Sequence, residues 1–274
     1  MAEAGADKGT ADRRIARLKR LLWPKERWRR ACVGLLAVLL PFALADMVFP
    51  PPMERARHVS TVVTARDGAV LRAFPVEDGK WRLRTNIETL DPAFVRALLA
   101  YEDKRFYAHS GVDPIAMVRA ALSSASAGRV VSGGSTITMQ TARLLEPRPR
   151  NVGSKLIESF RAMQLDWRYS KDEILELYLT LAPYGGNLEG VRAASWAYFG
   201  KEPSNLSPDQ IAMLIALPQS PEARRPDLRP DTAIAARKRV LDRLAGEGVF
   251  AADLTAESAE YPAPSRRDFP TLAW

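Results

Sequence analysis

The stretch DPAFVRALLAYEDKRFYAHSGVDP, residues 91–114, decides the fold of this sequence. Asp91 stands directly before Pro92, which is the pattern of an N-cap followed by a proline at the first helical position, and the same pair recurs at 113–114. The stretch therefore predicts a helix over 92–103 and a second helix that begins at 114. The first helix has an apolar face made of Phe94, Val95, Leu98 and Leu99.

Glu102 is the most informative residue of this stretch. It follows Leu98 by four residues, so its carboxyl group projects from the apolar face of the helix rather than into bulk water. A carboxylate in that place usually has a partner or a purpose, and partial burial suits a general base near neutral pH. The structural alternative is an ion pair with Lys104 or Arg105 at the helix end, and spacing alone leaves both interpretations open.

Downstream, the sequence continues as a series of helices. Ser170 with Glu173, and Ser207 with Gln210, have the spacing of capping boxes. The body over 87–247 is therefore predicted to be a mainly α domain, and 248–274, which lacks clear periodicity, is predicted to be a C-terminal tail. The further helices are predicted over 114–127, 136–146, 152–169, 171–181, 189–199, 208–217 and 231–245.

Upstream, residues 53–86 alternate between apolar and polar residues and contain two Asp-Gly turn signals, which predicts a small β-hairpin stalk. The apolar run 31–49 precedes the stalk. Its 19 residues, at about 1.5 Å each, can just cross a hydrocarbon core of roughly 30 Å. The basic segment 1–30 before it predicts a cytoplasmic N-terminal tail, a single-pass anchor in the inner membrane and a periplasmic body. A cleaved signal peptide ending near Ala43-Leu44-Ala45 is the alternative.

Charge and cysteine usage narrow the function classes. The 274 residues have a formal net charge of +8, but residues 1–30 carry ten Lys and Arg against four acids, or +6. Because the basicity belongs to this tail, no nucleic-acid partner is expected. With one cysteine and two histidines in the chain, a His/Cys zinc site is excluded, and any metal would be a hard cation held by oxygens.

A second group of polar residues lies beyond the first stretch. The segment 132–136, SGGST, joins a glycine turn to a helix start, where backbone N–H groups and hydroxyls favour an anionic oxygen. Arg143, Arg150 and Lys155 follow at spacings that could converge on the same anion. Glu158 shares a helix face with Lys155, which fits either a site or a simple i,i+3 ion pair.

Five segments in order resemble the motifs of glycosyltransferase family 51, and they cover roughly residues 60–245. EDKRFYAHSG at 102–111 has the form E-D-x-x-F-x-x-H-x-G of the first motif. The –TMQ ending of the second segment and the APYGG of the fourth are most similar to the 1C type within this family. The other four segments are GGSTITMQ (133–140), SKLIE (154–158), KDEILELYLTLAPYGG (171–186) and RKRVL (237–241).

The resemblance implies a lysozyme-like, mainly helical domain with a membrane-facing lobe, in which Phe106, Ile115, Met117, Val118 and Leu122 are expected to reach the bilayer surface. It implies that the chain polymerises lipid II, with the growing glycan chain as donor, inversion at the anomeric carbon and release of undecaprenyl pyrophosphate. By position, Glu102 and Glu158 match the family's catalytic carboxylates, and a divalent cation, Mg²⁺ or Mn²⁺, is implied as a helper for the leaving group. The matched substrate-binding positions are Asp103, Ser135, Thr136, Gln140, Arg143, Arg150 and Lys155.

Some positions depart from the family pattern. Ser154 replaces the arginine that leads the third motif, Ile157 replaces a neighbouring cation, and Thr180 replaces the asparagine of the fourth motif. These changes predict reduced activity. Neither S-x-x-K nor K-T-G occurs in the sequence, so the tail 248–274 is expected to carry no transpeptidase domain.

Two other functions fit the same segments. A lysozyme-like lytic enzyme would use one acid in a similar place but would need no cations for a diphosphate. A non-catalytic scaffold would hold other cell-wall synthesis proteins through an inactive domain. The expected partners are accordingly lipid II, the growing glycan chain, the inner membrane and other proteins of cell-wall synthesis.

Overall fold

The computed structural model describes residues 28–37, 39–68, 70–127 and 134–271, and the chain divides into two compact units, Met1–Pro50 and Pro51–Trp274. Within its described residues, the first unit contains the 21-residue helix Trp28–Val48, which includes an 18-residue window with a mean hydropathy of 2.2. By length and composition this helix can cross a membrane. It covers nearly all of the segment predicted at 31–49.

The second unit begins with the short helix α2 (Glu54–Arg57) and a β-hairpin. β1 (Thr61–Thr64) pairs antiparallel with β2 (Val70–Phe74), as the sequence predicts. β3 (Trp81–Arg82), however, leaves the predicted stalk and pairs in parallel with β4 (Leu188–Glu189). This pairing ties the stalk to the helical body, and it includes a hydrogen bond of 2.8 Å from the Trp81 N–H to the Asn187 carbonyl.

The eight helices predicted between 92 and 245 have the predicted bounds to within two residues at each end. Their starts are fixed by side-chain caps, for example Asp91 before α3 (Pro92–Glu102) and the complete capping box of Ser170 and Glu173 before α7 (Lys171–Leu181). Three 3₁₀ turns lie between them, η1 (Ile87–Thr89), η2 (Phe106–Ala108) and η3 (Leu217–Gln219). The other helices are α4 (Pro114–Ala127), α5 (Ile137–Leu145), α6 (Val152–Arg168), α8 (Val191–Phe199), α9 (Pro208–Ala216), α10 (Pro230–Gly246) and α11 (Ala252–Ala259).

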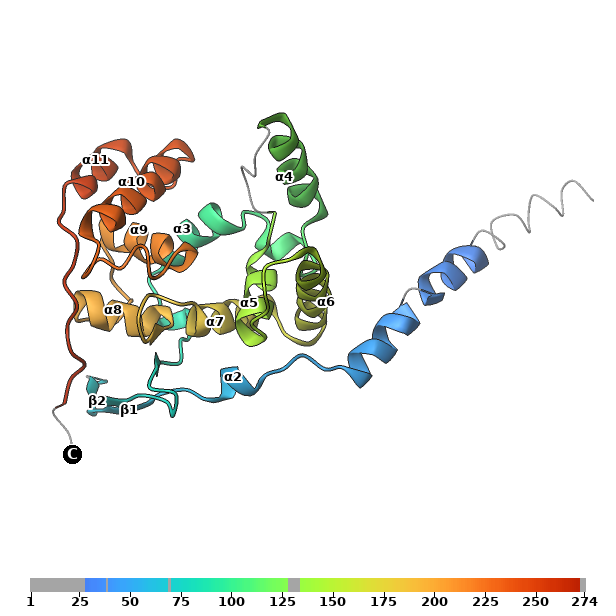
Figure 1. The fold of residues 1–274 in the computed structure, drawn as a ribbon, viewed down its shortest axis with the longest axis horizontal. Coiled ribbons are helices and arrows are strands. Elements are labelled where there is room, and N and C mark those ends of the chain that lie inside the picture. Colours follow the sequence, from blue (N-terminus) through green and yellow to red (C-terminus); the bar gives the residue numbers. More distant parts are fainter. Residues whose placement is uncertain (1–27, 38, 69, 128–133, 272–274) are drawn as a thin grey trace, which may run out of the picture. The chain divides into compact units, whose positions relative to one another are not determined.

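The core is centred on α9. Its residues 211–216, IAMLIA, are apolar all round and are each at most 1% exposed, as expected for a helix with neighbours on every side. α10, α11, α3 and α8 pack against it. α5 in turn packs between α6 and α7 (Figure 1). Buried residues of both α3 and α5 belong to the same hydrophobic core.

The C-terminal segment is ordered, which corrects the expectation of an irregular tail. After α11 the chain runs back along the body to the hairpin (Figure 1). The buried side chain of Arg237 donates to the carbonyls of Ala259 and Pro262, and the Phe269 ring stacks on Trp81 at 4.1 Å. Sequence periodicity could not predict this segment, because its order comes from contacts with distant residues.

Candidate active site

Glu102 is the last residue of α3 and lines a cavity of about 470 Å³. Each of its carboxylate oxygens accepts a hydrogen bond from a side-chain amide. Gln140 of α5 donates to Oε2 at 3.1 Å, and Gln219 of η3 donates to Oε1 at 2.9 Å. The structural alternative from the sequence is not what forms, because Lys104 pairs with Glu247 and Arg105 with Asp113. The carboxylate is therefore oriented by neutral donors and faces a cavity.

Gln219 is a site residue that the sequence analysis missed. The amide oxygen of Gln219 accepts a hydrogen bond of 2.9 Å from Arg224, whose guanidinium also donates to the Ala216 carbonyl at 2.7 Å. Arg224 thus fixes the orientation of the Gln219 amide, with its NH₂ group toward Glu102. The only sequence signal was Pro218, which ends the buried helix α9 and so places Gln219 at the edge of the core.

Asp103 lines the same cavity, but its carboxylate is used within the fold. It is buried, lies 3.0 Å from Nε2 of His109 and accepts the Ile137 N–H at 3.0 Å. His109 therefore acts as a structural hydrogen-bonding partner of Asp103. Asp103 joins the end of α3 to the start of α5, and this fixes Gln140 one turn into α5 opposite Glu102.

The predicted anion site at the start of α5 is largely occupied by the protein itself. Thr136 accepts the Met139 N–H and donates to the Gly111 carbonyl, and Asp103 takes the Ile137 N–H. Ser135 is half-buried and lines the Glu102 cavity. Ser132 and Gly133 lie outside the described residues. The N–H groups of Ile137 and Met139 thus donate to capping side chains of the protein rather than to a phosphate.

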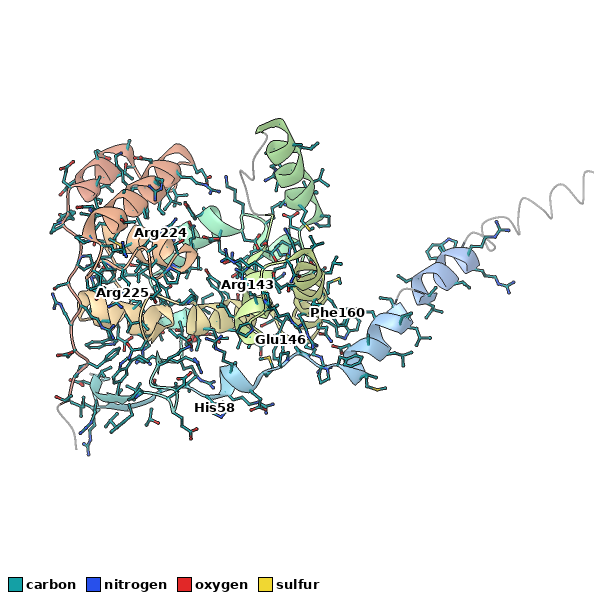
Figure 2. The ribbon with its side chains drawn as sticks, viewed as in Figure 1. His58, Arg143, Glu146, Phe160, Arg224 and Arg225 are labelled. Carbon is teal, nitrogen blue, oxygen red and sulfur yellow. The ribbon has the colours of Figure 1, made fainter. Side chains whose placement is uncertain are left out.

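Arg143 and Glu158 form a second pair next to this cavity. Arg143 lies one turn after Gln140 on α5, and its guanidinium is 3.8 Å from the Glu158 carboxylate on α6 (Figure 2 labels Arg143). Glu158 is buried, at 9% exposed, so its charge requires this partner. The i,i+3 pair of Lys155 with Glu158, one of the two alternatives left open by the sequence, does not form among the described residues, because Glu158 pairs with Arg143. Lys155 and Arg150 are exposed, and within the described residues neither has an ion pair.

Two buried phenols form the protein wall next to Glu102. Burial, and then the charge of Glu102, raises the pKa of Tyr178 and of Tyr184 well above the ordinary value for tyrosine. For Tyr178, the charge of Arg143 acts in the opposite direction. Both phenols therefore stay neutral at physiological pH.

Two of the three residues that depart from the family motifs, Thr180 and Ser154, are buried and form hydrogen bonds within the fold. Thr180 is buried and accepts the Thr85 N–H at 3.1 Å, so it joins α7 to the segment after β3. Ser154 is buried in the first turn of α6, where Asn151 accepts its N–H at 2.8 Å. Ile157 is exposed. Neither Thr180 nor Ser154 lines the Glu102 cavity.

The described residues do not fit a protein-held metal centre, because no group of three or more His, Cys, Asp or Glu side chains among them could hold an ion. Asp103 is committed to His109 and α5, and Glu158 to Arg143. A Mg²⁺ or Mn²⁺ ion would need most of its ligands from substrate oxygens.

Comparison with known proteins identifies the family. The model of the family described as Transglycosylase matches residues 67–245. Penicillin-binding protein 1C of Escherichia coli is 46% identical over 259 residues, which is 91% of this chain and 33% of that protein. Penicillin-binding protein 1A of Aquifex aeolicus is 32% identical over 251 residues, 88% of this chain and 34% of that protein. The chain thus spans about a third of the length of these two relatives.

Among solved structures, penicillin-binding protein 1A of Haemophilus influenzae aligns with 77% of this chain and 22% of that chain, at 18% identity and a TM-score of 0.42. The family assignment rests instead on the sequence matches, which span all five motif segments around Glu102. They confirm the resemblance to glycosyltransferase family 51 and to its 1C type. The chain belongs to the transglycosylase family.

Proposed function

We propose that this chain is a peptidoglycan glycosyltransferase that polymerises lipid II, with Glu102 as its general base. The observation that carries the proposal is the geometry of Glu102. Its two oxygens are held by Gln140 and Gln219 at the wall of a cavity, and a cation on α5 lies one turn beyond Gln140. One oriented base and cations for a diphosphate are what transfer from a good leaving group requires.

In the proposed reaction Glu102 removes the proton from the 4-hydroxyl of the acceptor sugar. That oxygen attacks the anomeric carbon of the growing chain in line, so the configuration changes from α to β. The bond to the lipid diphosphate breaks, and undecaprenyl pyrophosphate leaves with both electrons of that bond. Arg143, Lys155 and Arg150 stabilise the negative charge of the leaving group, and Glu158 orients Arg143.

Incubation of the full chain with fluorescent lipid II tests the proposal. Polymer is the expected product. A lytic enzyme would instead shorten a preformed glycan, and a scaffold would leave lipid II unchanged, so either result would overturn the proposal. Omission or addition of Mg²⁺ and Mn²⁺ in the same assay tests the proposed contribution of a divalent cation.

Replacement of Gln219 by methionine removes the amide donor while keeping a similar volume. We expect kcat for polymerisation to fall about tenfold with little change in KM, because an unoriented Glu102 is a poorer base while the binding surfaces persist. The measurement is steady-state kinetics with lipid II. Ser220→Ala, at the neighbouring position, is the control, and an equal loss in both variants would contradict a specific role for Gln219.

The proposed membrane-facing surface differs in part from the sequence expectation. We expected Phe106, Ile115, Met117, Val118 and Leu122 to reach the bilayer surface. Phe106 is only 1% exposed and is therefore excluded, whereas three residues of α4 (Ile115, Val118 and Leu122) are well exposed. α6 adds a stripe of exposed apolar side chains at i, i+4, i+11 and i+15, namely Val152, Leu156, Met163 and Trp167. A chain with an inner-membrane anchor and a periplasmic body would place this surface within reach of a lipid-linked substrate.

The variant Leu156→Glu with Trp167→Glu tests this surface. In a chain without residues 1–50 we expect the fraction bound to lipid vesicles to fall about tenfold, because two apolar side chains no longer leave water on binding. Cosedimentation with vesicles measures it. Val63→Glu, at an exposed valine of β1, is the control. Absence of vesicle binding before any substitution would refute the proposed surface.

A further inference from the structure

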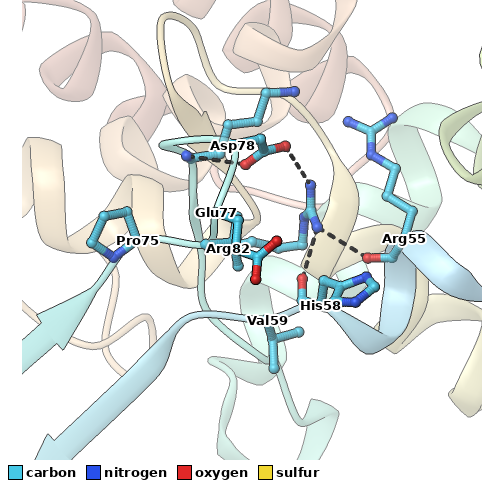
Figure 3. Close-up of a pocket in the computed structure, with 9 residues that line it drawn as sticks. Arg55, His58, Val59, Pro75, Glu77, Asp78 and Arg82 are labelled. Atoms are coloured by element: carbon cyan, nitrogen blue, oxygen red, sulfur yellow. Dashed lines mark hydrogen bonds and ion pairs between the residues drawn. The ribbon is translucent and has the colours of Figure 1, made fainter.

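Two neighbouring cavities extend from Arg143 toward the stalk. The first, of about 320 Å³, is lined by Arg143 and by the glycine turn at 185–186. The second, of about 560 Å³, lies at the stalk and is shown in Figure 3. Arg55 and Lys80 line both cavities, so the two spaces share a wall. Arg55 also donates to the Leu144 carbonyl at 2.8 Å, which fixes this shared wall to the end of α5 beside Arg143.

A buried ion network makes this wall rigid. Glu189 of β4 accepts hydrogen bonds from Arg55 (2.5 Å), Lys80 (2.6 Å) and Arg82 (2.7 Å). Arg82 is 2% exposed, and its Nη1 donates to the carbonyls of Arg55 and His58 at 3.0 and 2.7 Å (Figure 3). The network holds the cavity side chains in place before any ligand binds.

The charge of the larger cavity argues against an anionic ligand. Its three cations, Arg55, Lys80 and Arg82, are matched by Glu77 and Asp78, which also line it, and by Glu189, which accepts hydrogen bonds from all three, so the formal charges cancel. The guanidinium of Arg82 already donates to Glu189 and to two backbone carbonyls. In the larger cavity a diphosphate would therefore find neither net positive charge nor a free guanidinium fork.

The larger cavity offers instead the groups that bind a neutral sugar. His58 and Glu77 line it, and within the described residues neither side chain has a hydrogen bond or ion pair. The half-exposed carboxylate of Asp78 lies beside them. Val59, Pro75 and Val76 supply apolar surface. An N-acetylhexosamine has an apolar C–H face and a rim of hydroxyl and amide groups, which matches this mixture.

We propose that the two cavities form a path that binds the saccharide part of the growing glycan strand, beyond the sugar that reacts at Glu102. The proposal rests on the proposed polymerase function, because the strand is its donor. The path begins at Arg143, where the leaving group is placed, and ends at the stalk. A strand held along it stays on the enzyme between additions, so this path sets the length of the product.

The test separates binding from catalysis. Lipid-free peptidoglycan oligosaccharides are titrated into the full chain carrying Glu102→Gln, and fluorescence anisotropy gives the Kd. With Val76→Trp added, we expect Kd to rise about tenfold, because an indole fills the larger cavity. With Glu77→Gln, which keeps the volume, we expect a severalfold rise, because a charged acceptor is lost. Val63→Trp, on β1 outside the cavities, is the control and should leave Kd unchanged.

The active chain gives a second readout, since Val76→Trp should shorten the glycan strands severalfold on a gel. Unchanged Kd and strand length in both cavity variants would overturn the path, and so would an equal effect of Val63→Trp. Thermal unfolding of each variant shows whether it folds, and Glu77→Gln keeps the test valid if Val76→Trp does not. Failure of the polymerase proposal looks different, because lipid II would then stay unpolymerised while oligosaccharide binding still depended on Val76.

Discussion

Replacement of Glu102 by glutamine is expected to lower polymerisation of lipid II by a factor of about 10² to 10⁴. Glutamine has nearly the same shape, and Gln140 and Gln219 can still reach its side chain, so the cavity should persist. An amide cannot accept the acceptor's proton, however, and the 4-hydroxyl oxygen then remains a weak nucleophile. The loss should therefore appear in kcat, with lipid II binding preserved.

Single-turnover kinetics with fluorescent lipid II, together with a binding titration, measure both quantities. Glu88→Gln is the matched control, because Glu88 is an exposed carboxylate on η1 that does not line the Glu102 cavity. Polymerisation at the original rate in Glu102→Gln would refute the assignment of the base. Loss of lipid II binding in that variant would mean that Glu102 holds the substrate rather than activating it.

Replacement of Glu189 by glutamine is expected to lower the free energy of unfolding by about 3 kcal/mol. Glu189 is buried and is the common acceptor of Arg55, Lys80 and Arg82. Without the charge of Glu189, the buried guanidinium of Arg82 would keep two backbone carbonyls but only one charged partner within the described residues, the distant carboxylate of Asp78 at 3.7 Å. Breaking a buried ion pair typically costs about 3 to 5 kcal/mol of unfolding free energy. The lower value applies here because Arg55 and Lys80 are partly exposed and can turn toward water.

Denaturant unfolding as a function of pH measures this contribution. Burial alone would raise the pKa of Glu189, but the hydrogen bonds from Lys80 and Arg82 and the charges of Arg55 and Arg82 outweigh it and hold the pKa below the ordinary value. The stabilisation is therefore fully present above the unfolded pKa of about 4.3. It is lost as the pH falls through the lowered pKa of the folded state.

The wild-type chain should accordingly lose stability on acidification below about pH 4, whereas Glu189→Gln should lose less over the same range. Asp242→Asn is the control, because its pair with Lys238 is exposed on both sides and should contribute little. An unfolding free energy that is the same in Glu189→Gln and wild type would show that the network does not stabilise the fold.

Local chemistry allowed the sequence to predict the helices. Asp91, Ser170 and Ser207 each stand where a helix needs an acceptor for its first N–H groups, and the observed helices begin directly after them. The position of Glu102 at the end of an apolar face is local in the same way. The family motifs are short and contiguous, so they too could be recognised before any contact was known.

Contacts between distant residues decided the rest, and no pattern along the chain records them. The partners of Glu102 on its two sides lie 38 and 117 residues away, at Gln140 and Gln219. Phe106 was expected at the membrane, but the core covers it, and an apolar side chain looks the same in sequence in either place. The tail after α11 was expected to be irregular, yet Arg237 and Trp81 hold it.

For Glu102, the sequence and the tertiary structure therefore determine different properties. The sequence by itself determined that a carboxylate ends an apolar helix face within a family motif, because helical periodicity and capping depend on neighbours a few residues apart. Only the tertiary structure decided which groups hold that carboxylate and which cavity it faces. Those depend on where α4, α5 and η3 pack, and side-chain packing in three dimensions fixes such contacts.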